Sequence, residues 1–143
     1  MKYLLPLCLS AGLLAACSSD GTYSAAPPAE ASFQLAGKEW VLVELNGQAV
    51  GQSERPATLN LTTDNKINGN GGCNRFFGSY EILPQQRIRF SGVGSTRMAC
   101  AEGMATEQAY LGVFNEADSY SLTGSTLSLD KGRATALARF EAK

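Results

Sequence analysis

Two short segments contain the polar and reactive side chains best suited to binding or catalysis. One contains Cys73, Asn74 and Arg75, and the other contains Arg97 and Cys100. If the two cysteines were joined, their Cα atoms would lie about 5–6 Å apart, so the two arginines would be neighbours. Arginine binds carboxylate and phosphate groups well, and we therefore predict a partner-binding or anion-binding patch at Asn74, Arg75 and Arg97. A structural role stays open, in which Asn74 serves a turn and the arginine stems cover apolar surface.

The N-terminus has the pattern of a secretory signal. Met1 and Lys2 give a positive start, and residues 3–14 form an uncharged, mostly apolar stretch that is too short for a stable membrane span. Leu14-Ala15-Ala16-Cys17 then resembles the bacterial lipobox, in which signal peptidase II cleaves before a cysteine that already carries diacylglycerol. We predict a signal peptide over residues 1–16 and lipidation of Cys17. The alternative is an ordinary signal with a chance cysteine at the boundary.

The residues after the predicted anchor have few large apolar side chains. Residues 17–32 cannot bury a core, so we predict a flexible, lipidated tether there. Two or more acyl chains on one cysteine anchor a protein stably, so the first predicted partner is a membrane. Ser18 stands where an aspartate would favour retention, and by resemblance to the sorting rule of enteric lipoproteins this favours the outer membrane, with the domain in the periplasm.

Four cysteines are present, of which Cys8 would leave with the signal and Cys17 would carry lipid. Cys73 and Cys100 are then an even pair in an oxidising compartment, which favours a structural disulfide. Loop entropy assigns such a closure roughly 3.5 kcal/mol of stabilisation. The alternatives are two buried free thiols or a redox pair, although no Cys-x-x-Cys occurs and nothing marks either thiol as activated.

Composition argues against several classes of function. The chain has no histidine, which removes Ser-His-Asp and Cys-His catalysis and histidine metal sites. Its carboxylates are scattered, and residues 69–72 lack the Gly-Lys-Ser/Thr of a phosphate-binding loop. The formal net charge is −1, whereas nucleic-acid binding needs a basic surface. We expect no enzymatic activity, no metal, no cofactor and no nucleic-acid partner.

The elements that must position these residues are mainly short strands. Alternating apolar residues and turn residues predict strands near residues 40–45, 57–62, 66–68, 76–83, 87–91, 120–122, 127–129 and 137–140. Asn46-Gly47 between two such runs predicts a hairpin turn.

One segment has helical periodicity instead. Residues 102–118 place Met104, Leu111, Phe114 and Ala117 on one apolar stripe, with Glu107 elsewhere. The predicted fold class is therefore mainly β with one helix (α+β). We expect a small antiparallel, lipocalin-like or cracked β-barrel over residues 33–143, closed by that amphipathic helix.

Several runs of the chain resemble the META domain family of the HslJ heat-shock type. The similarity lies in Leu35-Ala36-Gly37-Lys38-Glu39-Trp40-Val41-Leu42, in Asn46-Gly47, in Gly72-Cys73-Asn74-Arg75-Phe76-Phe77-Gly78-Ser79-Tyr80 and in Thr96-Arg97-Met98-Ala99-Cys100. This resemblance implies a lipocalin-like or cracked β-barrel with one helix. It also implies a non-enzymatic envelope protein linked to heat stress and novobiocin tolerance, and it supplies no catalytic residues.

Two classes of function stay open at this point. The first is a stress-response interaction module that presents a surface near the membrane to an envelope protein or an anionic ligand. The second is a barrel that holds an acyl chain or a small apolar ligand, by analogy of fold with lipid-binding pilot lipoproteins. A filled barrel with an exposed patch near Arg75 and Arg97 would favour the first class, and a deep apolar cavity would favour the second.

Overall fold

The computed structural model describes residues 27–143, so the predicted signal peptide and Cys17 lie outside the described part of the chain. In chain order its elements are α1 (Pro28–Leu35), β1 (Glu39–Leu45), β2 (Gln48–Ala49), β3 (Thr58–Leu61), β4 (Lys66–Asn70), β5 (Arg75–Leu83), β6 (Arg87–Ser95), α2 (Met104–Glu116), β7 (Ser119–Thr123), β8 (Thr126–Lys131) and β9 (Thr135–Ala142). Neither helix is long and apolar enough to cross a bilayer.

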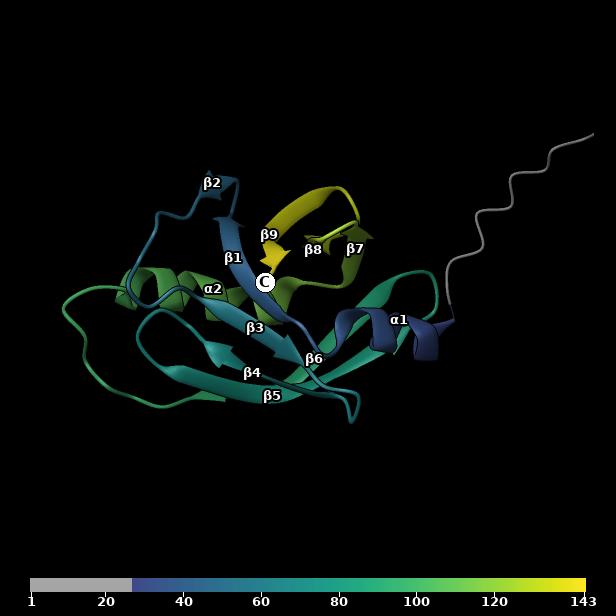
Figure 1. Ribbon diagram of the computed structural model, residues 1–143, viewed down its shortest axis with the longest axis horizontal. Helices are drawn as coiled ribbons and strands as arrows, with labels where there is room; N and C mark the ends of the chain where they lie inside the picture. Colours follow the sequence, from purple (N-terminus) through teal and green to yellow (C-terminus); the bar gives the residue numbers. More distant parts are fainter. Residues whose placement is uncertain (1–26) are drawn as a thin grey trace, which may run out of the picture.

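The strands form one antiparallel sheet that closes into a ring (Figure 1). The order is β2-β1-β3-β4-β5-β6-β7-β8-β9, and β1 also pairs with β9, for example through Trp40 and Ala142. The hairpin that joins β1 to β2 turns at Asn46-Gly47, whose φ angles of 51° and 79° suit this tight turn. The predicted α+β class, built mainly from antiparallel strands, is confirmed.

Helix α2 covers the part of the ring where strand pairing is thinnest. Strands β6 and β7 share a single register pair, Arg87 with Ser119, and α2 packs against β6 and β9. The helix that the sequence predicts over residues 102–118 is therefore present, over residues 104–116. Its predicted apolar stripe is wrong in part, because Met104 is exposed and Glu107 is buried. The face that α2 turns to the ring begins with a carboxylate rather than with an apolar side chain.

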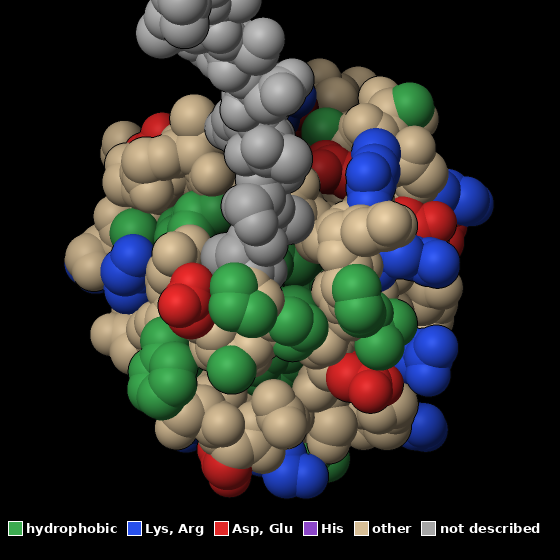
Figure 2. All heavy atoms as spheres, turned by 90° about the vertical axis from the view of Figure 1, so that its right-hand side faces the viewer, with side chains coloured by type: hydrophobic (Ala, Val, Ile, Leu, Met, Phe, Trp, Pro, Cys, Tyr) green, Lys and Arg blue, Asp and Glu red, His purple; other side chains and the backbone are tan. Residues whose placement is uncertain are grey.

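The structure has a second helix, α1, where the sequence predicts the end of a flexible tether. The predictions of a single helix and of a tether as far as residue 32 are wrong at this point. Pro28 stands in the first turn of α1, where its missing N–H costs no hydrogen bond. Ala31 and Leu35 are buried, and the Leu35 carbonyl accepts a 2.9 Å hydrogen bond from the Trp40 indole. Figure 2 shows hydrophobic side chains gathered on this end of the molecule, where Phe33 is 73% exposed.

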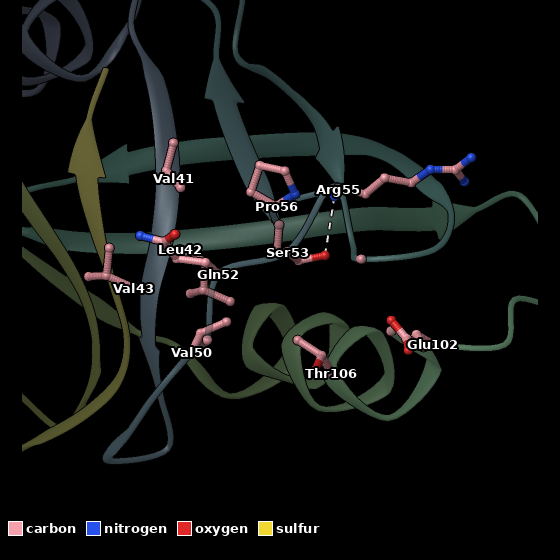
Figure 3. A pocket seen from close by; sticks show the side chains of 14 residues that line it. Val41, Leu42, Val43, Val50, Gln52, Ser53, Arg55, Pro56, Glu102 and Thr106 are labelled. Atoms are coloured by element: carbon pink, nitrogen blue, oxygen red, sulfur yellow. Dashed lines mark hydrogen bonds between the residues drawn. The ribbon is translucent and has the colours of Figure 1, made fainter.

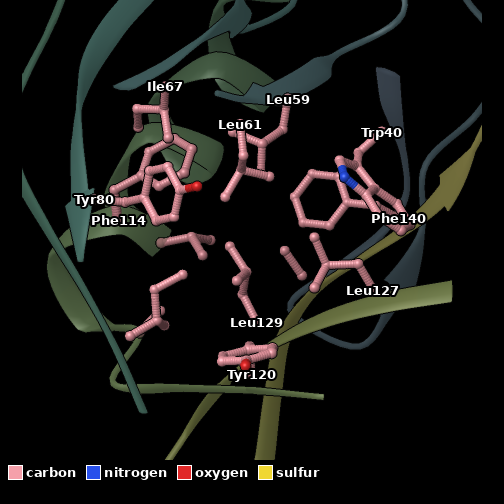
Figure 4. Packing of buried hydrophobic residues seen from close by; sticks show 14 of the residues in the cluster. Trp40, Leu59, Leu61, Ile67, Tyr80, Phe114, Tyr120, Leu127, Leu129 and Phe140 are labelled. Carbon is pink, nitrogen blue, oxygen red and sulfur yellow. The ribbon is translucent and has the colours of Figure 1, made fainter. Parts of the chain in front are cut away.

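The interior of the ring is filled with side chains (Figure 4). Trp40 and Phe140 are fully buried between β1 and β9, and α2 contributes Tyr110 and Phe114 from the other side. Burying a large apolar side chain stabilises a fold by roughly 1.5–3 kcal/mol, so this cluster is the main source of stability. The buried Tyr110 hydroxyl donates a 3.1 Å hydrogen bond to the Thr58 carbonyl, and burial raises the pKa of Tyr110 well above its ordinary value.

Candidate binding surface

A disulfide fixes the end of the ring that carries the predicted patch. Cys73, two residues before β5, is bonded to Cys100 in the loop before α2, and their Cα atoms lie 5.9 Å apart. The predicted Cys73–Cys100 disulfide is therefore confirmed. It joins the β4–β5 turn to residues 96–103. These residues connect β6 to α2 and form no helix or strand, so the disulfide ties this connection to the sheet.

A buried carboxylate accepts hydrogen bonds from the backbone at this disulfide. Glu107 is only 6% exposed. Its Oε2 atom accepts hydrogen bonds from the backbone N–H groups of Cys73, at 3.0 Å, and of Asn74, and its Oε1 atom accepts one from the Asn74 side-chain amide at 2.7 Å. Glu107 therefore ties α2 to the start of β5. Sequence periodicity missed this residue, because a search for an apolar stripe discards buried polar side chains.

The electrostatics of Glu107 follow from these contacts. Burial favours the neutral form of a carboxyl group and acts to raise its pKa. The hydrogen bonds from the Asn74 backbone, the Asn74 side chain and the Cys73 backbone outweigh burial and hold the pKa of Glu107 below its ordinary value. The buried group is therefore a carboxylate at neutral pH, and its hydrogen bonds are charge-assisted.

Asn74 uses its whole side chain inside this network. It is 3% exposed, and its Nδ2 atom donates to Glu107 and to the Met98 carbonyl at 3.2 Å. Its Oδ1 atom accepts from the Thr96 hydroxyl at 3.2 Å and from the Met98 N–H at 2.6 Å. Asn74 therefore has the structural role and is not accessible to a partner.

The two predicted arginines, in contrast, reach the surface. Arg75 and Arg97 are exposed, and the Arg75 carbonyl accepts a 3.0 Å hydrogen bond from the N–H of Thr96, so the two segments run side by side. Neither guanidinium takes part in the salt bridges found within residues 27–143. Two exposed arginines therefore stand on neighbouring segments that the disulfide, Glu107 and Asn74 join.

An exposed aromatic residue extends this surface along β5. Side chains alternate along the strand, so Arg75 and Phe77 point outward while Phe76 and Tyr80 point into the core. Phe77 is 58% exposed. The alternation in the sequence predicts a strand over residues 76–83 but does not distinguish Phe77 as a surface residue. The signal was available, because two adjacent phenylalanines in a strand must face opposite sides.

A separate groove runs between β1 and the start of α2 (Figure 3). It encloses about 490 Å³, and its apolar wall is made by Val41, Val43, Val50 and Pro56. Arg55 and Glu102 line it as well, so its charged groups have opposite signs and select no particular charge. Within residues 27–143, no group of three or more acidic or cysteine side chains is arranged to hold a metal ion.

Comparisons with known proteins agree with this architecture. The META domain family model matches residues 33–143. The fold is similar to the NMR structure of a protein from Burkholderia xenovorans, with 25% sequence identity, a TM-score of 0.62 and coverage of 97% of this chain and 99% of that chain. A second NMR structure shares 25% identity at a TM-score of 0.61, over 77% of this chain and 93% of that chain. A crystal structure of a DUF4847 family protein from Bacteroides vulgatus has a TM-score of 0.59 at 11% identity, over 78% of this chain and 96% of that chain, and shares the fold alone. No curated protein matches the chain significantly.

Proposed function

The chain belongs to the META domain family, and from that premise we propose that it is a non-enzymatic envelope lipoprotein that acts as a stress-response interaction module. It binds an anionic partner through the exposed surface around Arg75 and Arg97. One observation carries this proposal: two exposed arginines, without acidic partners in residues 27–143, lie on neighbouring segments that a disulfide and a buried carboxylate hold in place.

The interior of the ring supports a surface function. In the proposed lipocalin-like arrangement, a bound acyl chain would need an open cavity inside the strands. Here that space is occupied by Trp40, Tyr110, Phe114 and Phe140, all of them buried. The ring therefore serves as a scaffold, and the arginine surface outside it is the better candidate for recognition.

The arrangement of the two ends suits a tethered receptor. In Figure 1, α1 lies at one end of the domain and the loop between β6 and α2, which holds Arg97 and Cys100, lies at the other. A chain anchored by a lipid on Cys17 would connect to the domain at α1. The arginine surface would then face away from the outer membrane and into the periplasm, where anionic partners can reach it.

The test exchanges both arginines for an uncharged residue of similar length. The double variant Arg75→Gln/Arg97→Gln should keep the melting temperature within a few degrees of the wild type, because both side chains are exposed. It should nevertheless fail to restore tolerance to heat and novobiocin in a deletion strain. The matched control is Arg87→Gln/Arg89→Gln, which removes the same charge from two exposed arginines of β6.

The outcomes separate binding from folding. Full complementation by a stable Arg75→Gln/Arg97→Gln variant would contradict the proposal, and so would an equal loss of tolerance in the control. The anchor is tested separately with Cys17→Ala, which should abolish lipid attachment and processing by signal peptidase II. Mass spectrometry that still finds the acylated mature form would refute lipidation at that residue.

A further inference from the structure

The outer face of strands β3 to β6 carries an aromatic ring in line with two amide side chains. In the strand registers Asn60 pairs with Asn68, and Asn68 pairs with Phe77. Phe77 in turn pairs with Gly94. These four residues, called here the Phe77 row, therefore cross four neighbouring strands on one side of the sheet.

The ring of Phe77 lies beside Gly94 and is 58% exposed. A Cβ atom added at Gly94 would lie 3.7 Å from the ring, so the ring rests beside a residue that has no side chain of its own. Phe77 takes part in none of the ring–ring contacts found within residues 27–143, whereas Phe76 next to it packs on Tyr110 and Phe114. An exposed aromatic ring without aromatic neighbours offers a surface on which a ligand can stack.

The polar groups of the row are held in order. The Asn60 amide donates a 3.4 Å hydrogen bond to the Asn68 side-chain oxygen, so each amide keeps a free polar atom toward solvent. Lys66 stands in the adjacent row, and its ammonium group donates to the Ser79 hydroxyl at 3.2 Å. These contacts fix donors and acceptors beside the ring before any ligand arrives.

Positive charges lie on both sides of Phe77 within the sheet. Arg75 precedes Phe77 on the same outward face of β5, and Lys66 lies on the other side of the row. Asp64, in the turn before β4, offsets part of the Lys66 charge. Glu81 lies further along β5 and is already paired with Arg89 at 3.7 Å. Arg75 and Lys66 therefore flank the Phe77 end of the row. At the other end Asn60 pairs with Glu39 of β1, whose carboxylate lies 4.0 Å from the Lys143 ammonium group.

We propose that the Phe77 row binds peptidoglycan, a glycan of N-acetylated amino sugars whose peptide stems carry free carboxylates. The inference rests on the proposed function, since it names the anionic partner of that surface. A pyranose ring presents C–H groups that stack on an aromatic face, and its hydroxyl and N-acetyl groups match the Asn60 and Asn68 amides. The free carboxylates of the peptide stems match Arg75. A domain tethered to the periplasmic side of the outer membrane meets this polymer directly.

The experiment uses the mature lipidated protein in a mild non-ionic detergent, sedimented with purified peptidoglycan sacculi. Phe77→Ser should weaken the apparent affinity by about ten-fold or more, since the stacking surface is lost. Phe77→Trp should keep it, because the aromatic face is retained. The matched control is Phe33→Ser on α1, which removes a phenylalanine that is even more exposed, at 73%, and should leave binding unchanged.

The results that overturn the proposal are distinct from those that overturn the proposed function. Equal sedimentation of wild type and Phe77→Ser, an equal loss in Phe33→Ser, or binding to lipopolysaccharide or dextran in place of sacculi would each overturn the glycan assignment. If Phe77→Ser lowers the melting temperature, Asn68→Ala replaces it in the same comparison. Loss of stress tolerance in Arg75→Gln/Arg97→Gln together with no sacculus binding by the wild type would leave the arginine surface in place and remove only its glycan partner.

Discussion

Replacing Glu107 by glutamine should destabilise the domain far more than a change of one buried atom suggests. The carboxylate accepts hydrogen bonds on both oxygens, from two backbone N–H groups on one side and from the Asn74 amide on the other. A glutamine of the same shape has only one acceptor oxygen. Whichever way it is turned, its NH₂ group faces a donor.

The expected magnitude follows from counting these contacts. The better orientation of the glutamine keeps its oxygen toward Cys73 and Asn74 and sets its NH₂ against the Asn74 amide. One charge-assisted bond is then lost, at about 1.5–3 kcal/mol, and two others become neutral and weaker. The Asn74 amide cannot simply flip, because its oxygen accepts from Met98 and Thr96. Relief of the buried charge offsets part of this loss, which leaves a destabilisation of about 2–4 kcal/mol and a fall in melting temperature of about 10–20 °C.

The pH dependence supplies an independent check. The folded protein holds the pKa of Glu107 below the unfolded value near 4.5, so the folded state binds fewer protons at this site. The stabilisation is therefore complete above pH 4.5 and is lost as the pH falls through the folded pKa. Asp118 also has a lowered pKa, through hydrogen bonds from the Gly132 N–H and the Ser119 hydroxyl, so the informative quantity is the difference between wild type and Glu107→Gln, which should shrink in acid.

Thermal unfolding between pH 3 and pH 7, followed by circular dichroism, measures both effects. The control is Glu116→Gln on the same helix, whose exposed salt bridge to Lys131 contributes at most about 1 kcal/mol. The reasoning would be refuted if Glu107→Gln and Glu116→Gln lowered the melting temperature equally, or if the gap between wild type and Glu107→Gln did not narrow below pH 4.5.

Three further changes test the described fold. Reduction of the Cys73–Cys100 disulfide should lower the melting temperature clearly, because the closed loop stabilises the fold by roughly 3.5 kcal/mol; an unchanged value by calorimetry would contradict this. Gly69→Ala should prevent folding or cost several kcal/mol in a denaturant titration, since an added Cβ would lie 2.1 Å from a backbone carbonyl oxygen of β3. Gly112→Ala on α2 meets nothing within 4 Å and should instead stabilise by about 0.5–1 kcal/mol, and a loss there would count against the described helix.

Strand positions could be read from the sequence because alternation and turn residues act locally. The predicted strand near 40–45 is β1, and the one near 76–83 is β5. Asn46-Gly47 identified its hairpin, as positive φ angles are needed there. Helix α1 could not be recognised in the same way, because a helix of eight residues with two prolines before its first full turn has little periodicity to detect.

The candidate site was predictable in part for a related reason. The proximity of Arg75 and Arg97 follows from one disulfide, which the even cysteine pair indicated. The role of Glu107 depends on backbone donors 33 and 34 residues away in the sequence, and no local pattern encodes such a partner. The sequence placed Asn74 correctly beside the disulfide, but its burial gives it a structural role rather than a binding role.

The closure of the ring by β1 and β9 has a consequence for how the chain acquires its structure. The last strand pairs with the first, and Arg139 meets Glu44 across 95 residues of sequence. Contacts so distant along the chain slow folding, because the intervening loop must be closed before they form. Because the chain is synthesised from its N-terminus, one edge of β1 stays unpaired until β9 has been made. An unpaired strand edge can associate with other chains. The ring can therefore close only after the last strand is available, and until then the free edge of β1 can pair with other chains.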